Sequence, residues 1–524
     1  MDGKYYTDVY LFNDFKRNKI DQAFVNEDCF STSCSNVLNE LETYCPNVTD
    51  RLTDIFERAK DLNNPFELLQ LYIGRVDFES DSQLGTEFMD IWKNSKKVRN
   101  IREEEILNSS VTIKFVKELF NFYFRDELYG RFESPNNIIL SSGAVDERLW
   151  GLPNSLKECI TYALRNDWYG YSDSRGRDSC RVAISKYENN RIGLDLYDKE
   201  NVVITMGATH CISSLADFIL NKDQNFPVIC GIPNYPPLVE SINKRGNVAL
   251  VPISTKLGES SIRSIIDSVN SHTPLVMIQT VLNPNGTKVK EEEIKELILK
   301  CYPDTIVILD ECHEWLTDGP NPICPERSMS NVIRVSSLSK EWSVPGMKTG
   351  WFLGTKDFVK KFYEYASTMY GGPASFFYTL LEILTTMELW ISNGIKIPSD
   401  EDIKGMKDSY NFKKSQLIKA FSEYAQNRNK RKNELLAARS IATKMFSMDG
   451  IQVIPPKYSI NFAVNIPKYA DSYLSFRDIL LKTGVSFYPG ILNFCFSETI
   501  SRITFSNSKE KILKAATLVK TIMK

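Results

Sequence analysis

The sequence predicts an α/β fold in which helices cover a mostly parallel, seven-stranded sheet. Between about residue 137 and residue 355, short apolar runs alternate with helical stretches, and several runs are almost continuous in β-branched residues. Strands that are buried on both faces of a parallel sheet have this composition, and regular strand–helix alternation is typical of such a sheet. The candidate strands are residues 201–205, 227–232, 248–253, 275–280, 305–310, 332–337 and 350–355.

Residues 1–135 have a different character, and we expect them to form a mainly helical N-terminal extension. The stretches TDRLTDIFERAKDL (49–62) and VTIKFVKELFNFYFRDEL (111–128) place apolar residues at helical spacing. Thr49 or Asp50 could cap the first of these helices. The extension contains no motif that indicates a role.

Two further segments follow the extension. Residues 136–355 are predicted to form the large domain, and residues 356–524 to form inter-domain helices and a smaller α+β C-terminal domain. The strands SINFAVNI and SRITFS and the closing helix SKEKILKAATLVKTIMK indicate the α+β part. The run NRNKRKNE (427–434) is predicted to be a solvated helix face.

Composition excludes several classes of function. A chain of 524 residues is expected to form two or three domains, and its net charge of -2 gives no electrostatic basis for binding nucleic acid or an anionic membrane. No apolar run approaches about 20 residues, and the first residues lack the pattern of a signal peptide. The 11 cysteines form no C-x-x-C pair, which argues against a disulfide framework and a structural metal site. We therefore expect a cytoplasmic protein.

Four polar motifs follow predicted strands in order along the chain. Each motif alone is weak, because Gly207 could be only a turn, Asp310 a helix cap and Lys340 a surface lysine. Parallel sheets bind ligands at the carboxyl ends of their strands, so the four motifs together predict one site. They are MGATH (206–210), LNPNGT (282–287), LDECH (309–313) and SSLSKEWSVPGMKTGW (336–351).

These motifs contain the residue types that a pyridine aldehyde cofactor such as pyridoxal 5′-phosphate (PLP) requires. A lysine must form an imine with the aldehyde, and a carboxylate must pair with the pyridinium nitrogen. A phosphate favours the N–H groups of a helix N-terminus together with hydroxyls and a cation. The candidates are Lys340 for the imine, Asp310 for the ring nitrogen, Asn283 for the phenolic oxygen, Gly207, Ala208, Thr209, Ser337, Ser339 and Lys348 for the phosphate, and Tyr235 for stacking on the ring.

The chain resembles the class I/II aminotransferases, a family of the PLP-dependent fold type I superfamily that includes aspartate aminotransferase. The resemblance covers roughly residues 137–524 and rests on the NPxG box at 283–286, Asp310, the SxSK box at 337–340 and the glycines and cation at 346–350. It implies that Lys340 carries PLP as a Schiff base and moves the substrate proton. It also implies that Asp310 pairs with the pyridine nitrogen.

The resemblance assigns further residues to the site. Arg502 in SRITFS would grip the substrate α-carboxylate through a bidentate fork, and Gly143 in LSSGAVDE would line the substrate entrance together with Asn283. Tyr171 in YGYSDSRG would reach the phosphate of the neighbouring subunit, and the loop YGGPAS (370–375) would also belong to a shared site. The family therefore implies a homodimer with shared active sites.

Two positions depart from the family pattern. His313 stands where a tyrosine usually lies beside the phenolic oxygen, and its charge can change near neutral pH. Lys348 stands where an arginine is usual, which replaces a bidentate phosphate fork by a point charge.

These observations favour a PLP-dependent aminotransferase that acts on an α-amino acid, with a place in amino acid metabolism or biosynthesis. The alternative is a PLP-dependent lyase, synthase, decarboxylase or γ-substitution enzyme, because one fold supports all of these reactions. A non-catalytic regulator ranks third, since the extension shows no helix-turn-helix pattern and no basic stripe. The substrate side chain and the amino acceptor cannot be read from the sequence.

Overall fold

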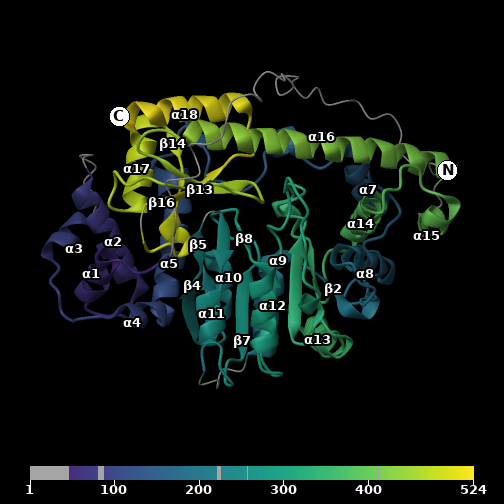
Figure 1. Cartoon of the computed structure of the whole chain (residues 1–524), viewed down its shortest axis with the longest axis horizontal. Helices are drawn as coiled ribbons and strands as arrows, with labels where there is room; N and C mark the ends of the chain where they lie inside the picture. Colours follow the sequence, from purple (N-terminus) through teal and green to yellow (C-terminus); the bar gives the residue numbers. More distant parts are fainter. Residues whose placement is uncertain are drawn as a thin grey trace, which may run out of the picture. The chain divides into compact units, whose positions relative to one another are not determined.

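A computed structural model describes residues 46–80, 88–220, 226–256, 258–410, 413–497 and 499–523 (Figure 1). The chain divides into two compact units, and each unit takes segments from distant parts of the sequence. We name one unit after Lys340 and the other after Arg502, which they contain. The lysine unit contains described residues 145–211 and 322–435, and the arginine unit contains described residues 46–144, 212–321 and 436–523.

The lysine unit contains three of the expected strands, in the order β2-β11-β10. Both pairings in this group are antiparallel, because β11 runs against its two neighbours. Apolar residues of the strands and of the surrounding helices form one core, which includes Trp342, Trp351 and Tyr424. The elements are β2 (Val202–Thr205), β10 (Val332–Ser337), β11 (Gly350–Leu353), α6 (Glu147–Trp150), α7 (Asn154–Arg165), α8 (Asp178–Ile192), α13 (Lys356–Met369), α14 (Tyr378–Ser392) and α15 (Asp400–Tyr410).

The arginine unit contains the other four expected strands, in the order β9-β7-β3-β4, and all three pairings are parallel. Helices α10 and α11 pack against β4 (Figure 1). Every residue of β3 and β7 is buried, as continuous apolar runs predict. The elements are β3 (Val228–Ile232), β4 (Val248–Pro252), β7 (Leu275–Gln279), β9 (Ile306–Asp310), α10 (Pro236–Asn243), α11 (Arg263–Ser268) and α12 (Glu291–Lys300). All seven predicted strands are therefore confirmed.

Two helices pass from one unit to the other. Helix α9 (Gly207–Ile219) begins in the lysine unit and ends in the arginine unit, and α16 (Lys414–Phe446) does the same. The arginine unit also contains a small three-stranded sheet that the apolar runs do not predict, because its strands are short and polar. Its order is β5-β6-β8, from Ser254–Lys256, Glu259–Ser261 and Lys288–Val289.

The C-terminal part of the arginine unit has the predicted α+β structure. An antiparallel sheet in the order β12-β13-β16-β15 lies with α17 and α18. A separate parallel bridge joins β1 to β14. The elements are β1 (Ile138–Ile139), β12 (Gln452–Ile454), β13 (Asn461–Asn465), β14 (Val485–Ser486), β15 (Tyr488–Pro489), β16 (Ile500–Thr504), α17 (Ser472–Thr483) and α18 (Lys509–Met523). The domain boundaries near residues 135 and 355 remain predictions.

The described part of the N-terminal extension is helical, as predicted. Thr49 caps the first helix by accepting a hydrogen bond from the Leu52 amide, and the apolar faces of the helices are buried, with Ile55, Ile73 and Phe115 fully enclosed. The segment after Phe122 continues in π-helical geometry. The helices are α1 (Asp50–Arg58), α2 (Pro65–Glu79), α3 (Met89–Asn94), α4 (Glu103–Leu107), α5 (Ser110–Phe122) and η4 (Tyr123–Arg131).

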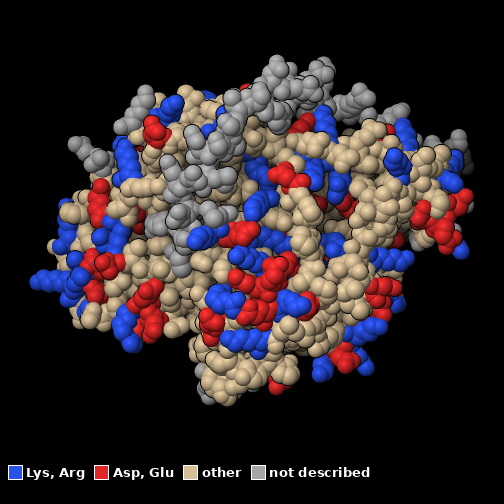
Figure 2. All heavy atoms as spheres, viewed as in Figure 1, with Lys and Arg blue, Asp and Glu red and all other residues tan. Residues whose placement is uncertain are grey.

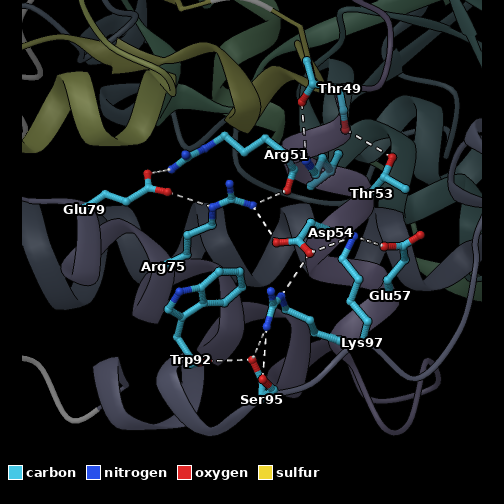
Figure 3. Close-up of polar contacts among 12 residues, drawn as sticks. Thr49, Arg51, Thr53, Asp54, Glu57, Arg75, Glu79, Trp92, Ser95 and Lys97 are labelled. Carbon is cyan, nitrogen blue, oxygen red and sulfur yellow. Dashed lines mark hydrogen bonds and ion pairs between the residues drawn. The ribbon is translucent and has the colours of Figure 1, made fainter.

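A polar network joins the first helices of the extension (Figure 3). Arg75 of α2 donates to the Arg51 carbonyl at 2.9 Å and to Asp54 Oδ2 at 3.1 Å, so it bridges α2 to α1. The guanidinium groups of Arg58 and Arg75 both lie over the Trp92 ring, at 4.4 and 5.1 Å from its centroid. These cation–π contacts hold α3 against the other two helices.

A buried ionic cluster anchors the extension to α17. Arg477 of α17 forms ion pairs with Asp77 and Glu127 of the extension, and all three side chains are almost completely buried. The Tyr473 hydroxyl donates to Glu127 at 2.8 Å, and the Tyr72 hydroxyl donates to Asp471 at 2.7 Å. The extension is therefore built into the same unit as the C-terminal sheet.

The charged segment 427–434 has the predicted solvated face, with Lys430 and Lys432 exposed, but its other face is buried. Arg431 and Glu434 of α16 are buried, and Arg431 donates to the Trp150 carbonyl at 3.1 Å. Arg428 pairs with Glu388 at 2.6 Å. These charges are compensated inside the lysine unit, and a one-dimensional charge pattern does not reveal such partners.

Basic and acidic side chains lie next to one another on the face shown in Figure 2, without a large area of one sign. Within the described residues, no helix is long and apolar enough to cross a membrane.

We predict that Arg477→Met lowers the free energy of unfolding by about 3–5 kcal/mol, because it leaves two buried carboxylates without their cation. Urea unfolding followed by circular dichroism measures this change. Arg125→Met is the matched control, since the Arg125 side chain is 73% exposed and pairs with Asp126 at the surface; its effect should stay within about 0.5 kcal/mol. Equal effects of the two substitutions would show that the buried cluster is not an anchor.

Candidate active site

Lys340 lies three residues beyond the end of β10 in the lysine unit, and it is half-buried. Two hydrogen bonds fix the chain just before Lys340. The Ser339 amide donates to Ser337 Oγ at 3.4 Å, and the Leu338 amide donates to the Thr349 carbonyl at 3.1 Å. The predicted imine-forming lysine therefore follows the carboxyl end of a buried strand.

The predicted phosphate residues converge around Gly350 in the same unit. Gly350 pairs with both Ser337 and Thr205, the residues that end β10 and β2. A side chain at Gly350 would lie 2.6 Å from the Ser336 carbonyl oxygen and 3.2 Å from the Gly207 Cα, so only glycine fits. This close approach brings Ser337 beside the start of α9.

Helix α9 begins at Gly207, so Ala208 and Thr209 lie in its first turn. The amide groups of this turn have no partner inside the helix and attract anions. Gly207 and Lys348 both have left-handed backbone angles, with φ of +82° and +51°. Ala208 is half-buried, whereas Thr209 and Lys348 are exposed. The lysine unit thus brings the Ser337 side chain and the Lys348 backbone close to the N-terminus of α9.

Tyr171 is fully exposed in the loop between α7 and α8. Its expected role toward a neighbouring subunit remains a prediction.

Asp310 ends β9 in the arginine unit, where it is only 3% exposed. Its Oδ2 atom accepts a hydrogen bond from Gln279 Nε2 at 3.1 Å, and its Oδ1 atom accepts one from the Cys312 amide at 3.1 Å. Gln279 is in register with Asp310 at the end of the neighbouring strand β7. The acid is therefore held in a defined orientation at a strand end.

Gln279 also connects Asp310 to the predicted substrate residues. Its Oε1 atom accepts a hydrogen bond from the Asn283 amide at 3.4 Å, and Arg502 donates to Asn283 Oδ1 at 2.9 Å. One chain of contacts thus runs from Asp310 through Gln279 and Asn283 to Arg502. Sequence reasoning missed Gln279, although a polar residue that ends the apolar run LVMIQ was a usable signal.

Arg502 is buried in the middle of β16, and its guanidinium group is surrounded by neutral groups. It donates to the Ser141 carbonyl at 2.8 Å and lies 4.0 Å above the centroid of the Tyr488 ring. Its Nε atom has no hydrogen-bond partner, and no carboxylate pairs with Arg502 among the described residues. Burial lowers the pKa of Arg502, and nearby phenols, Tyr488 first, act in the opposite direction.

A buried cation without a counter-ion is costly, so this arrangement favours an anionic ligand. Gly143 lies directly beside the guanidinium group. A side chain at Gly143 would come within 2.8 Å of Arg502 Nη2, and its φ of +62° also favours glycine. Glycine at position 143 therefore lets the backbone approach the Arg502 fork closely, and a bidentate fork suits a carboxylate.

His313 is buried close to Asp310 in sequence, and its orientation is set by a second residue that sequence reasoning missed. Its Nδ1 atom lies 2.7 Å from Ser459 Oγ. Ser459 has a left-handed backbone with φ of +59°, and its amide donates to the Trp315 carbonyl at 2.8 Å. The contact of Nδ1 with Ser459 therefore fixes the orientation of the His313 ring.

Tyr235 precedes α10 and is half-buried. Burial raises the pKa of its phenol, and the charge of Arg502 opposes that shift. Its ring meets the Phe120 ring edge-on, at 5.8 Å between centroids. The structure thus places the predicted stacking residue in the same unit as Arg502.

Among the described residues, no group of histidine, cysteine, aspartate and glutamate side chains could hold a metal ion.

The sequence matches a known protein family. The family described as "Aminotransferase class I and II" matches residues 135–517. An aspartate aminotransferase of Pyrococcus horikoshii is 24% identical over 399 residues, which is 74% of this chain and 91% of that protein. A cystine lyase of Arabidopsis thaliana is 28% identical over 226 residues, which is 41% of this chain and 50% of that protein.

Solved structures have the same fold. A Thermus thermophilus aspartate aminotransferase mutant superposes with a TM-score of 0.58 at 18% identity, covering 73% of this chain and 95% of that one. The Escherichia coli protein YbdL, described as having a methionine aminotransferase function, superposes with a TM-score of 0.59 at 16% identity and covers 84% and 98%. These likenesses show the fold.

We predict that Gly143→Ala weakens the binding of a simple carboxylate such as propanoate by at least about tenfold, equivalent to about 1.4 kcal/mol. The added methyl group would displace the Arg502 fork. Isothermal calorimetry measures the affinity. Gly319→Ala is the control, because nothing lies within 4 Å of a side chain there and its φ is not positive; it should leave the affinity unchanged. An unaltered affinity in Gly143→Ala would contradict a carboxylate site at Arg502.

Proposed function

Because the chain belongs to the class I and II aminotransferase family, we propose that it binds PLP and transfers the amino group of an α-amino acid. The observation that carries this proposal is the chain of contacts from Asp310 through Gln279 and Asn283 to Arg502. It links an acid suited to a pyridinium nitrogen with a buried cation suited to a carboxylate. Asp310 is thus suited to the cofactor and Arg502 to the amino acid substrate, the two molecules that the reaction brings together.

The resemblance to the family assigns each predicted residue to one part of the cofactor. In the lysine unit, the amides of Gly207, Ala208 and Thr209, the hydroxyls of Ser337 and Ser339 and the Lys348 cation would hold the phosphate. In the arginine unit, Asp310 would pair with the ring nitrogen, Asn283 and His313 would contact the phenolic oxygen, and Tyr235 would cover the ring. When bound, PLP supplies an aldehyde for imine formation and an electron sink for the substrate carbanion.

The protein's own residues would supply imine formation, proton transfer and binding of the substrate carboxylate. The Lys340 amine would form the imine with the cofactor and then carry a proton from the substrate α-carbon. Arg502 would bind the α-carboxylate, with Gly143 and Asn283 beside it, and would thereby fix the orientation of the α-carbon. Asp310, held by Gln279, would keep the ring nitrogen protonated.

A PLP-dependent lyase is the second candidate, and two observations favour it. His313 replaces the usual tyrosine at the phenolic oxygen, and a cystine lyase is among the similar proteins. A synthase, decarboxylase or γ-substitution enzyme would use the same residues. Mass spectrometry of the products separates these reactions, because transamination yields a keto acid and a lyase releases ammonia together with a fragment of the side chain.

We predict that borohydride reduction of the PLP-loaded protein attaches a phosphopyridoxyl group to Lys340, because a reduced imine is stable. Peptide mass spectrometry locates the adduct. Lys340→Ala should lose the visible absorbance of the bound cofactor and all amino transfer, whereas the nearby Lys356→Ala, whose ammonium group pairs with Asp198 at the surface, should keep both. An adduct on another lysine would refute the assignment.

A homodimer is the proposed assembly, and the cytoplasm is the proposed compartment. The exposed Tyr171 is the residue that supports a shared site, since its hydroxyl would reach the phosphate bound by the partner. We predict a dimer in sedimentation equilibrium and a severalfold weaker PLP affinity for Tyr171→Phe, which removes one hydrogen bond to a charged group. Tyr169→Phe is the control, because its hydroxyl donates to Asp167. A fully active monomer would contradict the proposal.

A further inference from the structure

The helices of the extension bring aromatic side chains to the surroundings of Arg502. Helix α5 and the π-helical segment η4 belong to the arginine unit, together with β15 and β16. The π-helical segment has non-helical backbone angles at Tyr129 and Gly130. Such π-helical turns occur frequently at functional sites. No sequence motif assigned a role to this segment.

Four rings form a continuous aromatic wall, which we define as Phe120, Phe124, Tyr235 and Tyr488. Phe120 meets Tyr235 at 5.8 Å and Phe124 at 5.0 Å between ring centroids, both edge-on. Phe124 lies 6.1 Å from Tyr488, whose ring carries the Arg502 guanidinium on its face. The wall therefore begins at the carboxylate-binding group and continues without interruption into the extension.

The wall is partly open. Tyr488 is buried beneath Arg502, but Phe120, Phe124 and Tyr235 are each only half-buried. Tyr129 stacks on Phe124 at 6.2 Å with an interplanar angle of 14°, and it is 51% exposed. Partly exposed aromatic rings that adjoin a buried cation are suited to bind the apolar portion of a ligand.

The charges near the wall argue against a second carboxylate on the ligand. The groups that shift the pKa of Arg502, apart from burial, are phenols, and no other cation is among them. Lys117 lies over the Phe120 ring at 5.1 Å, but its charge interacts with Glu118, Glu240 and Lys244. Its ammonium group donates a hydrogen bond to Asn121 Oδ1, and burial lowers its pKa although Glu118 and Glu240 act in the opposite direction.

We propose that the aromatic wall is the subsite for the substrate side chain and that the substrate is an α-amino acid with an aromatic side chain. This inference rests on the proposed function, because it takes Arg502 as the site of the α-carboxylate. With that carboxylate on Arg502, the side chain of the same molecule lies within reach of the rings beside it. An aromatic side chain buries a large apolar area and can meet neighbouring rings edge-on.

The first experiment measures binding without catalysis. Isothermal calorimetry on the PLP-loaded full chain compares 3-phenylpropanoate with propanoate, which share the carboxylate and differ by one ring. We expect 3-phenylpropanoate to bind at least about tenfold more tightly. Phe124→Ala and the milder Phe124→Leu should reduce this ratio severalfold.

Phe122→Ala is the matched control. Phe122 is the last residue of α5, two positions before Phe124, and its ring packs against Phe88, at 6.3 Å between centroids. It should keep the full ratio. Thermal unfolding confirms that each variant is folded, and Phe124→Leu keeps most of the buried volume if Phe124→Ala fails to fold. Equal affinities for the two carboxylates would overturn the proposal.

The second experiment measures the rate at which bound PLP is converted by single amino acids. Phenylalanine, tyrosine and tryptophan should give a kcat/KM at least tenfold above those of alanine, aspartate and glutamate. Faster conversion by aspartate or glutamate would overturn the proposal and point to Lys117 as a reader of the distal carboxylate. If no amino acid converts PLP while 3-phenylpropanoate still binds selectively, the proposed transfer reaction fails and the aromatic subsite stands.

Discussion

A guanidinium group that is removed from water without a carboxylate partner must be held by neutral groups, and Arg502 is in this situation. The Asn283 amide oxygen, the Ser141 carbonyl oxygen and the Tyr488 ring together provide the required electron density. Each of these partners must be placed accurately, because a buried cation tolerates little loss of contact. The need to hold Arg502 therefore constrains three separate segments of the arginine unit.

The same constraint reaches the cofactor residues through Gln279. Because the Gln279 amide contacts both Asp310 and the Asn283 backbone, a shift of the loop after β7 would disturb the acid and the arginine together. Parallel pairing of β7 with β9 fixes this geometry, since it puts Gln279 and Asp310 in register at two adjacent strand ends. Regular sheet structure thus supplies the precision that the chemistry requires.

The anchoring of the extension to α17 determines where its aromatic rings lie relative to Arg502. Ion pairs of Asp77 and Glu127 with Arg477 join it to α17 in the interior. This anchoring holds α5 and η4 in place, and with them the rings of Phe120 and Phe124. A segment that was anchored only by surface contacts could not keep aromatic side chains beside a binding site, because surface ion pairs contribute little.

The sequence alone determined the seven main strands, the order of the motifs and the residue types at their ends, because apolar periodicity and turn residues are local signals. Lys340 and Asp310 could be found in this way, whereas Arg502 was identified through the resemblance to the aminotransferases. Tertiary structure alone decided which partners these residues have. Gln279, Ser459 and the aromatic wall act through contacts between segments that are distant in sequence, and the burial of Arg431 depends on Trp150 in another helix. Such contacts depend on how helices and strands pack, and no local pattern encodes that packing.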